Sequence, residues 1–353
     1  MKKDVVLYIS PSDSEFVKKD INFLNSHCKV IHYSQDWGNK AQILKLFLNQ
    51  FFFLVKTVRK SDSIFIMFGG YWSFLPSIFG KIFNKRVYII LGGTDCVSFP
   101  SINYGSLRKK VLKKFIHWSY RMATRLLPVD DSLVFSENIY YENRVFNNQG
   151  FKYFFPKLKT PYSVINNGFN PAFFNGNINH KTQNSFISVA LTDDFNRFQL
   201  KGIDKIFFLA KEFKDCSFTI VGLKDQFKNQ LKSVPKNIEI LSFLSQEDLI
   251  IHLNRSEFYL QLSISEGFPN ALCEAMLCGC IPIGSKVGAI PKIIDNTGFL
   301  MESSNNNYIK KEFNKILTIN ISKRKELAKS ARLRVENEFH IQNREDKFLD
   351  LIK

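Results

Sequence analysis

The chain has 353 residues, 45% of them hydrophobic, and a formal net charge of +17. This length allows two domains with buried cores, and the composition excludes a disordered, collagen-like or low-complexity protein. No apolar run reaches the ~18–20 residues that a membrane-spanning helix needs, and the first apolar run is too short for a signal peptide. The six cysteines lack the paired spacing of a zinc site. We therefore expect a cytoplasmic protein without a metal.

In the first half of the chain, short apolar runs alternate with helical patterns. The apolar runs predict strands at 5–9, 29–32, 63–68, 86–91 and 126–129. Helical periodicity predicts helices near 13–26, 40–60, 73–83 and 106–125. Strands that alternate with helices form parallel sheets built from βαβ units. The sequence therefore predicts a Rossmann-like α/β domain over residues 1–167.

A polar, Asn-rich stretch at 166–185 then interrupts the pattern, and it predicts a linker over 168–185. The second half resumes with strands at 186–191, 217–221, 238–241, 258–262 and 281–284. Helices are predicted at 202–214, 246–254 and 269–279, and 307–353 is mostly helical. These elements predict a second Rossmann-like domain over 186–338, with a cleft between the two domains. Ligands of such sheets bind at the carboxyl ends of the strands.

The positive charge is concentrated in the first half. Residues 1–165 hold 24 Lys/Arg against 11 Asp/Glu, whereas residues 166–353 hold 25 against 21. Three aromatic and basic stretches carry the excess, at 41–60, 71–86 and 105–127. Basic amphipathic helices can bind anionic lipid surfaces. The same pattern also occurs in a helix that packs on the core with its basic face in water, and in a surface that binds nucleic acid. We favour lipid, because the sequence shows no zinc finger, aromatic RNP pattern or recognition-helix motif.

The strongest local signal is SISEGFPNALCEAM at 263–276. A strand leads into Glu266-Gly267, and a helix begins near Pro269, whose missing N–H suits a first turn. The N–H groups of residues 270–272 should then point out of the helix start and form an anion site with the helix dipole. Glu266 and Glu274 flank that site, and carboxylates accept hydrogen bonds from vicinal hydroxyls. The pattern suits a sugar nucleotide, whereas a single Glu here would only complement the dipole.

The pair Glu266 and Glu274, in the context EGFPNALCEAMLCGCIPIGSKVGAIPKII, resembles the donor-binding signature of the family 4 retaining glycosyltransferases, which belong to glycosyl transferases group 1 and have the GT-B fold. Further segments resemble the family in order along the chain: 165–168 (INNG), 201–204 (KGID), 219–222 (TIVG), 243–249 and 298–300 (GFL). The resemblance implies two Rossmann-like domains that face each other across a cleft, with a final helix at 339–353 that packs back on the first domain.

The resemblance also implies roles for individual residues. Glu274 would bind the ribose hydroxyls and Glu266 the hydroxyls of the transferred sugar, while Lys201 would neutralise the leaving diphosphate. The family's usual Gly-Arg pair is absent from 190–194 (ALTDD), so Arg197 is the expected substitute. The implied donor-binding residues also include Gly267, Phe268, Asn270, Ala271, Leu272, Gly222 and Phe243. Asp95, in a Gly-Gly-Thr-Asp segment, is expected on the acceptor side or, alternatively, as a turn cap.

The function implied is a retaining hexosyl- or N-acetylhexosaminyl-transferase that uses a UDP- or GDP-sugar and no metal. The basic first domain suggests a lipid-linked saccharide acceptor in bacterial lipopolysaccharide, O-antigen or capsule synthesis, at the inner face of the cell membrane, and no nucleic acid partner. For retaining members the resemblance implies attack on the same face as the leaving group, with no protein nucleophile. Two alternatives remain open: a nucleotide-sugar epimerase or hydrolase on the same fold, and a non-catalytic scaffold that binds sugar nucleotides.

Overall fold

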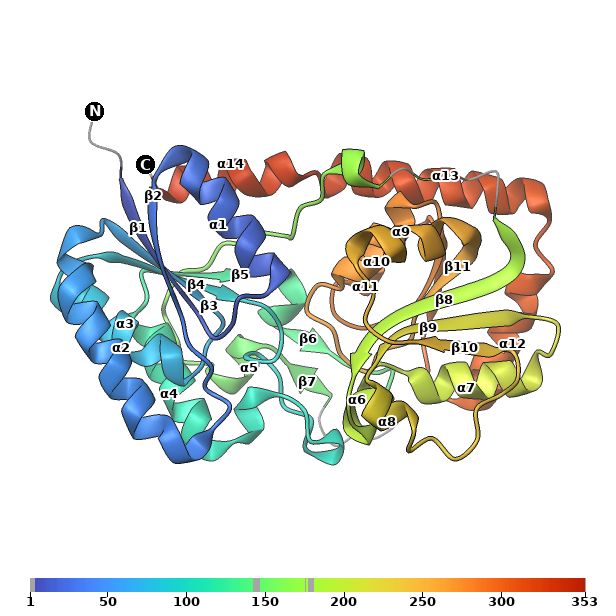
Figure 1. Ribbon diagram of the computed structural model, residues 1–353, viewed down its shortest axis with the longest axis horizontal. Helices are drawn as coiled ribbons and strands as arrows, with labels where there is room; N and C mark the ends of the chain where they lie inside the picture. The colour runs from blue at the N-terminus through green and yellow to red at the C-terminus, as the bar shows by residue number, and fades with distance from the viewer. Residues whose placement is uncertain (1–3, 142–146, 175, 177–180, 353) are drawn as a thin grey trace.

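The computed structural model describes residues 4–141, 147–174, 176 and 181–352. It contains two α/β domains, each built on a parallel sheet with helices packed on both faces (Figure 1). The predicted fold class is therefore confirmed. Residues 175 and 177–180 of the predicted linker lie outside the described residues.

The N-terminal domain has a five-stranded sheet among its described residues, and all its strand pairs are parallel. In sheet order the strands are β2 (Lys29–Ser34), β1 (Val5–Ser10), β3 (Ser63–Met67), β4 (Arg86–Leu91) and β5 (Arg125–Pro128). The helices are α1 (Glu15–His27), α2 (Ile43–Thr57), α3 (Phe74–Ile82), α4 (Lys110–Met122) and the short α5 (Phe151–Phe154). A two-stranded antiparallel ribbon, β6 (Ser136–Glu137) with β7 (Asn148–Gln149), lies toward the second domain (Figure 1). The central strands are mostly apolar and buried, as expected when helices cover both faces of the sheet.

The C-terminal domain has a six-stranded parallel sheet among its described residues. In sheet order the strands are β10 (Ile238–Leu241), β9 (Ser217–Leu223), β8 (Thr182–Thr192), β11 (Ser256–Gln261), β12 (Ile281–Ser285) and β13 (Phe299–Met301). The helices are α6 (Phe195–Leu200), α7 (Ile203–Glu212), α8 (Asp225–Lys228), α9 (Gln246–Arg255), α10 (Asn270–Leu277), α11 (Ile290–Ile294), α12 (Asn306–Leu317) and α13 (Ile321–Glu338). The strand order reverses between β8 and β11, so the carboxyl ends of these two strands border the crevice where such sheets bind ligands.

The last helix, α14 (Ile341–Ile352), follows α13 and packs on the N-terminal domain (Figure 1). The Arg344 guanidinium forms a buried ion pair with Asp20 of α1, with Nη2 and Oδ2 2.9 Å apart. The Phe348 ring stacks on Phe65 of β3, with 5.5 Å between the ring centroids. The chain therefore crosses between the domains twice, once at the linker and once between α13 and α14.

The structure differs from the predicted elements at two places that matter for the site. Strand β8 begins at Thr182, inside the segment predicted as linker, because Thr182 still pairs with Ser256 of β11. Helix α6 was not predicted, and it occupies the segment between β8 and the predicted helix at 202–214. Its six residues are too few for helical periodicity to be visible, and the Asp194 carboxylate caps its start.

Candidate active site

The loop between β11 and α10 carries the predicted anion site. Pro269 is the residue that caps the start of α10, one position before the helix rather than inside its first turn. No described residue accepts a hydrogen bond from the N–H groups of Asn270 and Ala271. The Leu272 N–H was also predicted to be free, and this was wrong, because it donates a hydrogen bond to the carbonyl of Pro269 (N···O 3.2 Å). The helix start therefore presents two N–H groups, not three, with the positive end of the helix dipole behind them.

Glu266 lies in this loop and is held in one position by three donors. Its Oε1 accepts hydrogen bonds from the Lys201 ammonium at 2.7 Å, the Ser263 hydroxyl at 2.7 Å and the Gln261 amide at 3.0 Å. The side chain is only 11% exposed. Ser263 and Gln261 were not predicted as site residues, although polar residues at the end of a buried strand are a usable signal. Their hydrogen bonds fix the carboxylate at the carboxyl end of β11.

Lys201 reaches Glu266 because their two loops are bonded together. Lys201 follows α6, and the carbonyl of Leu200 accepts a hydrogen bond from the N–H of Ile264 at 2.8 Å. Gly202 is then required, since its φ is +67° and a Cβ here would lie 2.0 Å from the Leu262 carbonyl oxygen. Such an approach leaves no room for any other residue. The Lys-Gly pair thus positions an ammonium beside the carboxylate.

Arg197 lies one turn before Lys201 on α6, but it does not join the Lys201–Glu266 pair. Its Nε is 3.6 Å from Oδ1 of Asp193, and its side chain is 56% exposed. Asp193 also pairs with Lys224 at 3.0 Å, and these two cations lower the pKa of its carboxyl. Arg197 therefore stands at the rim of the site, where it remains able to move toward an anion.

Glu274 lies on α10, one turn from the helix start, and is half-buried. Burial raises the pKa of Glu274, and the positive charge of Lys19 on α1 opposes that shift. No described residue donates a hydrogen bond to its carboxyl group, so both oxygens are available to accept hydrogen bonds from a ligand.

Two further predicted donor-binding residues lie at the ends of neighbouring strands. Gly222, near the end of β9, has a φ of +104°, and a Cβ there would lie 3.0 Å from the Ala190 carbonyl oxygen. Phe243 follows β10 and is 76% exposed. Both stand at the carboxyl edge of the sheet, but among the described residues no hydrogen bond or ion pair joins either of them to Glu266 or Lys201.

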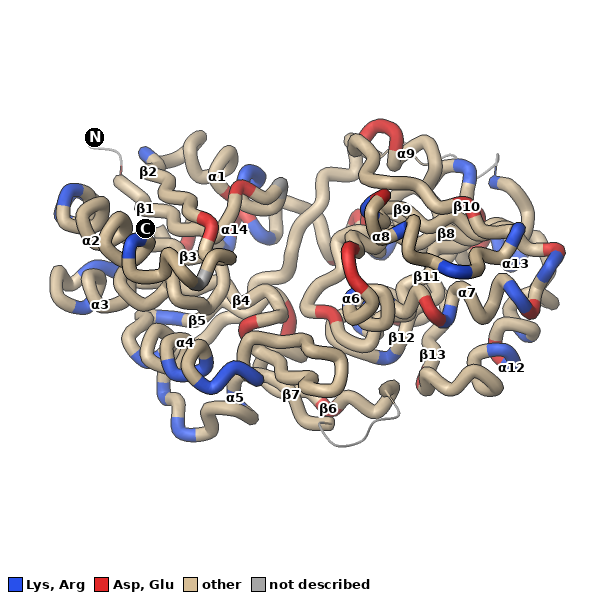
Figure 2. The backbone as a smooth tube through the Cα atoms, turned by 60° about the horizontal axis from the view of Figure 1, so that its bottom comes forward, with Lys and Arg blue, Asp and Glu red and all other residues tan. Residues whose placement is uncertain are grey.

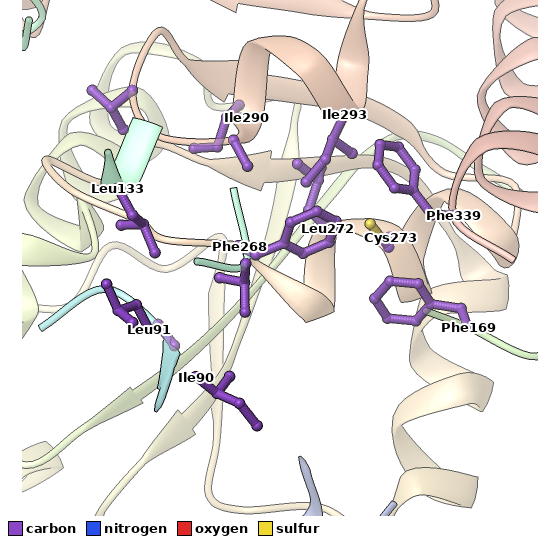
Figure 3. Close-up of a cluster of buried hydrophobic side chains, with 14 of the residues drawn as sticks. Ile90, Leu91, Leu133, Phe169, Phe268, Leu272, Cys273, Ile290, Ile293 and Phe339 are labelled. Atoms are coloured by element: carbon purple, nitrogen blue, oxygen red, sulfur yellow. The ribbon is translucent and has the colours of Figure 1, made fainter. Parts of the chain in front are cut away.

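The Phe268 side chain packs against the two segments where the chain crosses between the domains (Figure 3). It is buried, with its ring centroid 6.4 Å from that of Phe169 in the linker and 5.4 Å from that of Phe339 between α13 and α14. Its neighbour Asn270 accepts a hydrogen bond from the Asn167 amide at 2.8 Å. Both crossings of the chain are therefore packed against the start of α10, and only the backbone of Phe268 is left for a ligand.

The N-terminal domain contributes a glycine loop that touches the C-terminal loop directly. A Cβ on Gly267 would lie 2.1 Å from the Gly92 carbonyl oxygen, so only glycine allows this approach. Asp95 shapes the loop. It is buried, and its carboxylate accepts hydrogen bonds from the N–H groups of Gly69 (2.8 Å) and Gly93 (3.1 Å) and from the Tyr120 hydroxyl (2.9 Å). These contacts fit the alternative prediction that Asp95 caps a turn, because its carboxylate accepts hydrogen bonds from backbone N–H groups.

A cavity of about 430 Å³ opens beside Lys201, between the two domains. Tyr104 and Arg108 line it from the N-terminal domain, and Arg197 and Lys201 line it from the C-terminal domain. The Arg108 Nε is buried without a hydrogen-bond partner among the described residues. Burial and the nearby charge of Glu266 raise the pKa of Tyr104 well above its usual range, so its hydroxyl stays protonated. Sequence reasoning missed both residues because they lie in loops and in a stretch interpreted as a basic surface.

Comparisons with known proteins found similar sequences over parts of this chain. Residues 195–334 match the model of the family described as glycosyl transferases group 1. A segment of 94 residues is 38% identical to N-acetyl-alpha-D-glucosaminyl L-malate synthase of Bacillus anthracis, and 164 residues are 32% identical to the capsular polysaccharide biosynthesis glycosyltransferase CapH of Staphylococcus aureus. The first match covers 25% of this chain and 24% of the relative, and the second covers 44% of each.

Solved structures match over the whole chain. Sucrose-phosphate synthase from Thermosynechococcus elongatus superposes with a TM-score of 0.74 at 12% identity, covering 99% of this chain and 98% of that one. Anabaena HepE, solved in complex with UDP and glucose, superposes with a TM-score of 0.71 at 13% identity, covering 99% of both chains. At these identities the likeness establishes the fold, and that fold is GT-B.

Proposed function

Because residues 195–334 match the family model described as glycosyl transferases group 1 and the chain has a GT-B fold, we propose that the chain transfers a sugar from a nucleotide-sugar donor to an acceptor, with retention of the anomeric configuration. The donor would be a UDP- or GDP-sugar, and the transferred group a hexose or an N-acetylhexosamine. The similarity to CapH and the crystal complex of HepE with UDP and glucose support this proposal.

The observation that carries the proposal is the meeting of Lys201, Glu266 and the start of α10 at one edge of the sheet. When the bond between the anomeric carbon and phosphate breaks, negative charge develops on the nucleoside diphosphate. The Lys201 ammonium, which lies beside Glu266, and the N–H groups of Asn270 and Ala271 would stabilise that charge. No metal is needed in this scheme. Arg197, which lines the same cavity as Lys201, would add further positive charge.

The two carboxylates would hold the donor on either side of the diphosphate. Glu266 would accept hydrogen bonds from the sugar hydroxyls once Lys201 moves from it to the phosphate. Glu274 would accept hydrogen bonds from the ribose hydroxyls, since no described residue donates one to its carboxyl group. The acceptor hydroxyl would attack on the face of the leaving group, and a phosphate oxygen would take its proton. This scheme needs no protein nucleophile.

We further propose that the acceptor is a lipid-linked saccharide of bacterial surface polysaccharide synthesis, located at the inner face of the cell membrane. The supporting observations are the basic N-terminal domain, the excess of cations in the interdomain cavity and the similarity to a capsular polysaccharide glycosyltransferase. Such an acceptor carries a phosphate or diphosphate next to its sugar, and the Arg108 guanidinium is placed to bind one.

The test is a thermal-shift screen of the purified protein with UDP-, GDP- and ADP-sugars. A true donor at about 100 times its Kd should stabilise the protein by ~2.7 kcal/mol. Donor turnover, measured as nucleoside diphosphate release, should fall about 10²–10³-fold in Lys201→Ala, as expected when one charge-stabilising group is removed. It should also fall in Glu266→Ala, because that change removes the acceptor for the sugar hydroxyls. The exposed Lys214 provides a matched control, and Lys214→Ala should keep full turnover. Absence of any shift across the panel, or unchanged turnover in both site variants, would refute the proposal.

A further inference from the structure

The outer surface of the N-terminal domain carries apolar side chains where a water-exposed helix normally carries polar ones. On α2, Leu44, Leu48, Phe52 and Val55 each expose 50–71% of their surface, and Phe51 is also exposed. The opposite face of the same helix is buried through Leu46, Gln50 and Leu54. Helix α2 is therefore apolar on both sides, and packing within the chain accounts for only one of them.

The apolar surface continues over the two neighbouring helices. Ile82 on α3 and Val111 and Trp118 on α4 are exposed by 69%, 61% and 45%. Aromatic contacts hold the three helices side by side. The Phe51 ring lies 5.5 Å from Phe79 of α3, and Phe74 of α3 lies 5.7 Å from Trp118. We call this surface the α2–α4 face, defined by residues 44, 48, 51, 52, 55, 82, 111 and 118.

The α2–α4 face is surrounded by positive charge. From the start of α2 to the end of α4, residues 43–122 hold 13 Lys/Arg and two Asp. One of those acids, Asp95, is buried in the glycine loop. Lys45 and Lys56 are exposed beside the apolar row on α2, and Lys110 and Lys114 beside it on α4. Figure 2 shows Lys and Arg segments on α2, α3 and α4.

The charge and the shape together select one kind of partner. A second copy of the chain would place cations against cations, which costs energy. A nucleic acid would pair with the cations, but aliphatic side chains such as Leu44, Leu48 and Val55 have no partner on a phosphate backbone. An anionic lipid surface meets both requirements, because apolar side chains enter the boundary of the acyl chains while the Lys side chains reach the headgroups.

We propose that the α2–α4 face binds the surface of an anionic lipid bilayer, with α2 lying in the plane of the interface. None of the helices in the described part of the chain has the length and apolarity that crossing a bilayer requires. Arg108 and Lys109 line the interdomain cavity and immediately precede α4, whose second residue, Val111, belongs to the α2–α4 face. This inference deepens the proposed function and rests on it only for the acceptor: a lipid-linked substrate would reach the cavity along α4.

The test uses the full chain and vesicles of phosphatidylcholine with or without phosphatidylglycerol, at ~0.15 M salt. The protein should sediment with the anionic vesicles. The double variant Leu48→Glu/Phe52→Glu should bind at least tenfold more weakly, and each Lys-to-Ala change at Lys45 or Lys114 about fivefold more weakly. Leu333 on α13 is an exposed leucine of the other domain, and Leu333→Glu should bind like the wild type.

A second measurement follows the face directly. The emission of Trp118 should shift to shorter wavelength when anionic vesicles are added, and Trp118→Phe should abolish the shift. The proposal is overturned if the wild type ignores anionic vesicles, if it prefers duplex DNA to them, or if Leu333→Glu weakens binding as much as the double variant.

Donor binding is measured without vesicles, and vesicle binding is measured without donor. Each measurement therefore tests one proposal, the glycosyltransferase function or the bilayer-binding face, independently of the other. The double variant should keep the full thermal shift with its sugar nucleotide. A protein that binds vesicles but no donor would remove the proposed function and leave the bilayer-binding face standing.

Discussion

Replacing Gly267 with alanine tests whether the two domains must touch for catalysis. Gly267 does not have a positive φ, so alanine fits its backbone conformation. The new Cβ, however, would lie 2.1 Å from the Gly92 carbonyl oxygen and 2.9 Å from its carbon. A real Cβ contact is at least 3.0 Å, so the loops must separate by about 0.9 Å. The Gly92 loop cannot yield locally, because the Asp95 carboxylate holds the N–H groups of Gly92 and Gly93.

The expected loss follows from that separation. A misplacement of about 1 Å in an active site costs roughly 10²-fold in rate, which is about 2.7 kcal/mol of transition-state stabilisation. We therefore expect kcat/KM for transfer to fall about 10²-fold in Gly267→Ala. The Kd of the donor should change by no more than a few-fold, since its proposed nucleotide contacts all come from the C-terminal domain.

The assay combines initial rates of transfer with a donor titration and a melting curve. Gly38→Ala, in an exposed loop where the nearest atom is a side-chain oxygen of Asp36 at 3.1 Å, is the matched control and should keep its activity. A Gly267→Ala enzyme with full kcat/KM would refute the argument that contact of the two loops is part of the active geometry. The argument would also be refuted if the melting curve showed that Gly267→Ala is unfolded at the assay temperature and that this accounts for the whole loss of activity.

Three further variants test individual contacts by their effect on stability. Burial raises the pKa of Glu274, so folding disfavours the charged form of its carboxyl, and the free energy of unfolding falls as the pH rises from the ordinary pKa through the raised one. Glu274→Gln should therefore have a higher melting temperature than the wild type at pH 7, the same melting temperature below about pH 4, and weaker donor binding. A lower melting temperature of Glu274→Gln at pH 7 would contradict this. Arg344→Ala should lose about 3–5 kcal/mol by leaving Asp20 buried and unpaired, as checked by denaturant unfolding. Asp95→Asn should lower the free energy of unfolding by about 1–3 kcal/mol, because an amide has one acceptor oxygen and the N–H groups of Gly69 and Gly93 donate to different oxygens of the carboxylate. An unchanged midpoint of unfolding would show that the loop does not depend on these hydrogen bonds.

Much of the architecture was available from local patterns. The periodicities predicted the strands of both large sheets except β13, and the Gly-Phe-Pro-Asn context of Glu266 predicted a helix start at an edge of the second sheet. These features depend on residues close together in the chain, so the sequence displays them directly. The short elements α6, α8 and the β6–β7 ribbon escaped prediction because two to six residues carry too little periodic signal.

The amino-acid sequence by itself determined two α/β domains, the order of their elements and the identity of the two acids and the lysine at the candidate site. Only the tertiary structure decided that Lys201 binds Glu266 across 65 residues, that Asp95 turns onto backbone N–H groups, and that Arg108 enters a cavity. It also decided which apolar side of α2 is buried. These outcomes depend on how loops from separate elements meet and how the two domains dock, and residue periodicity holds no information about either.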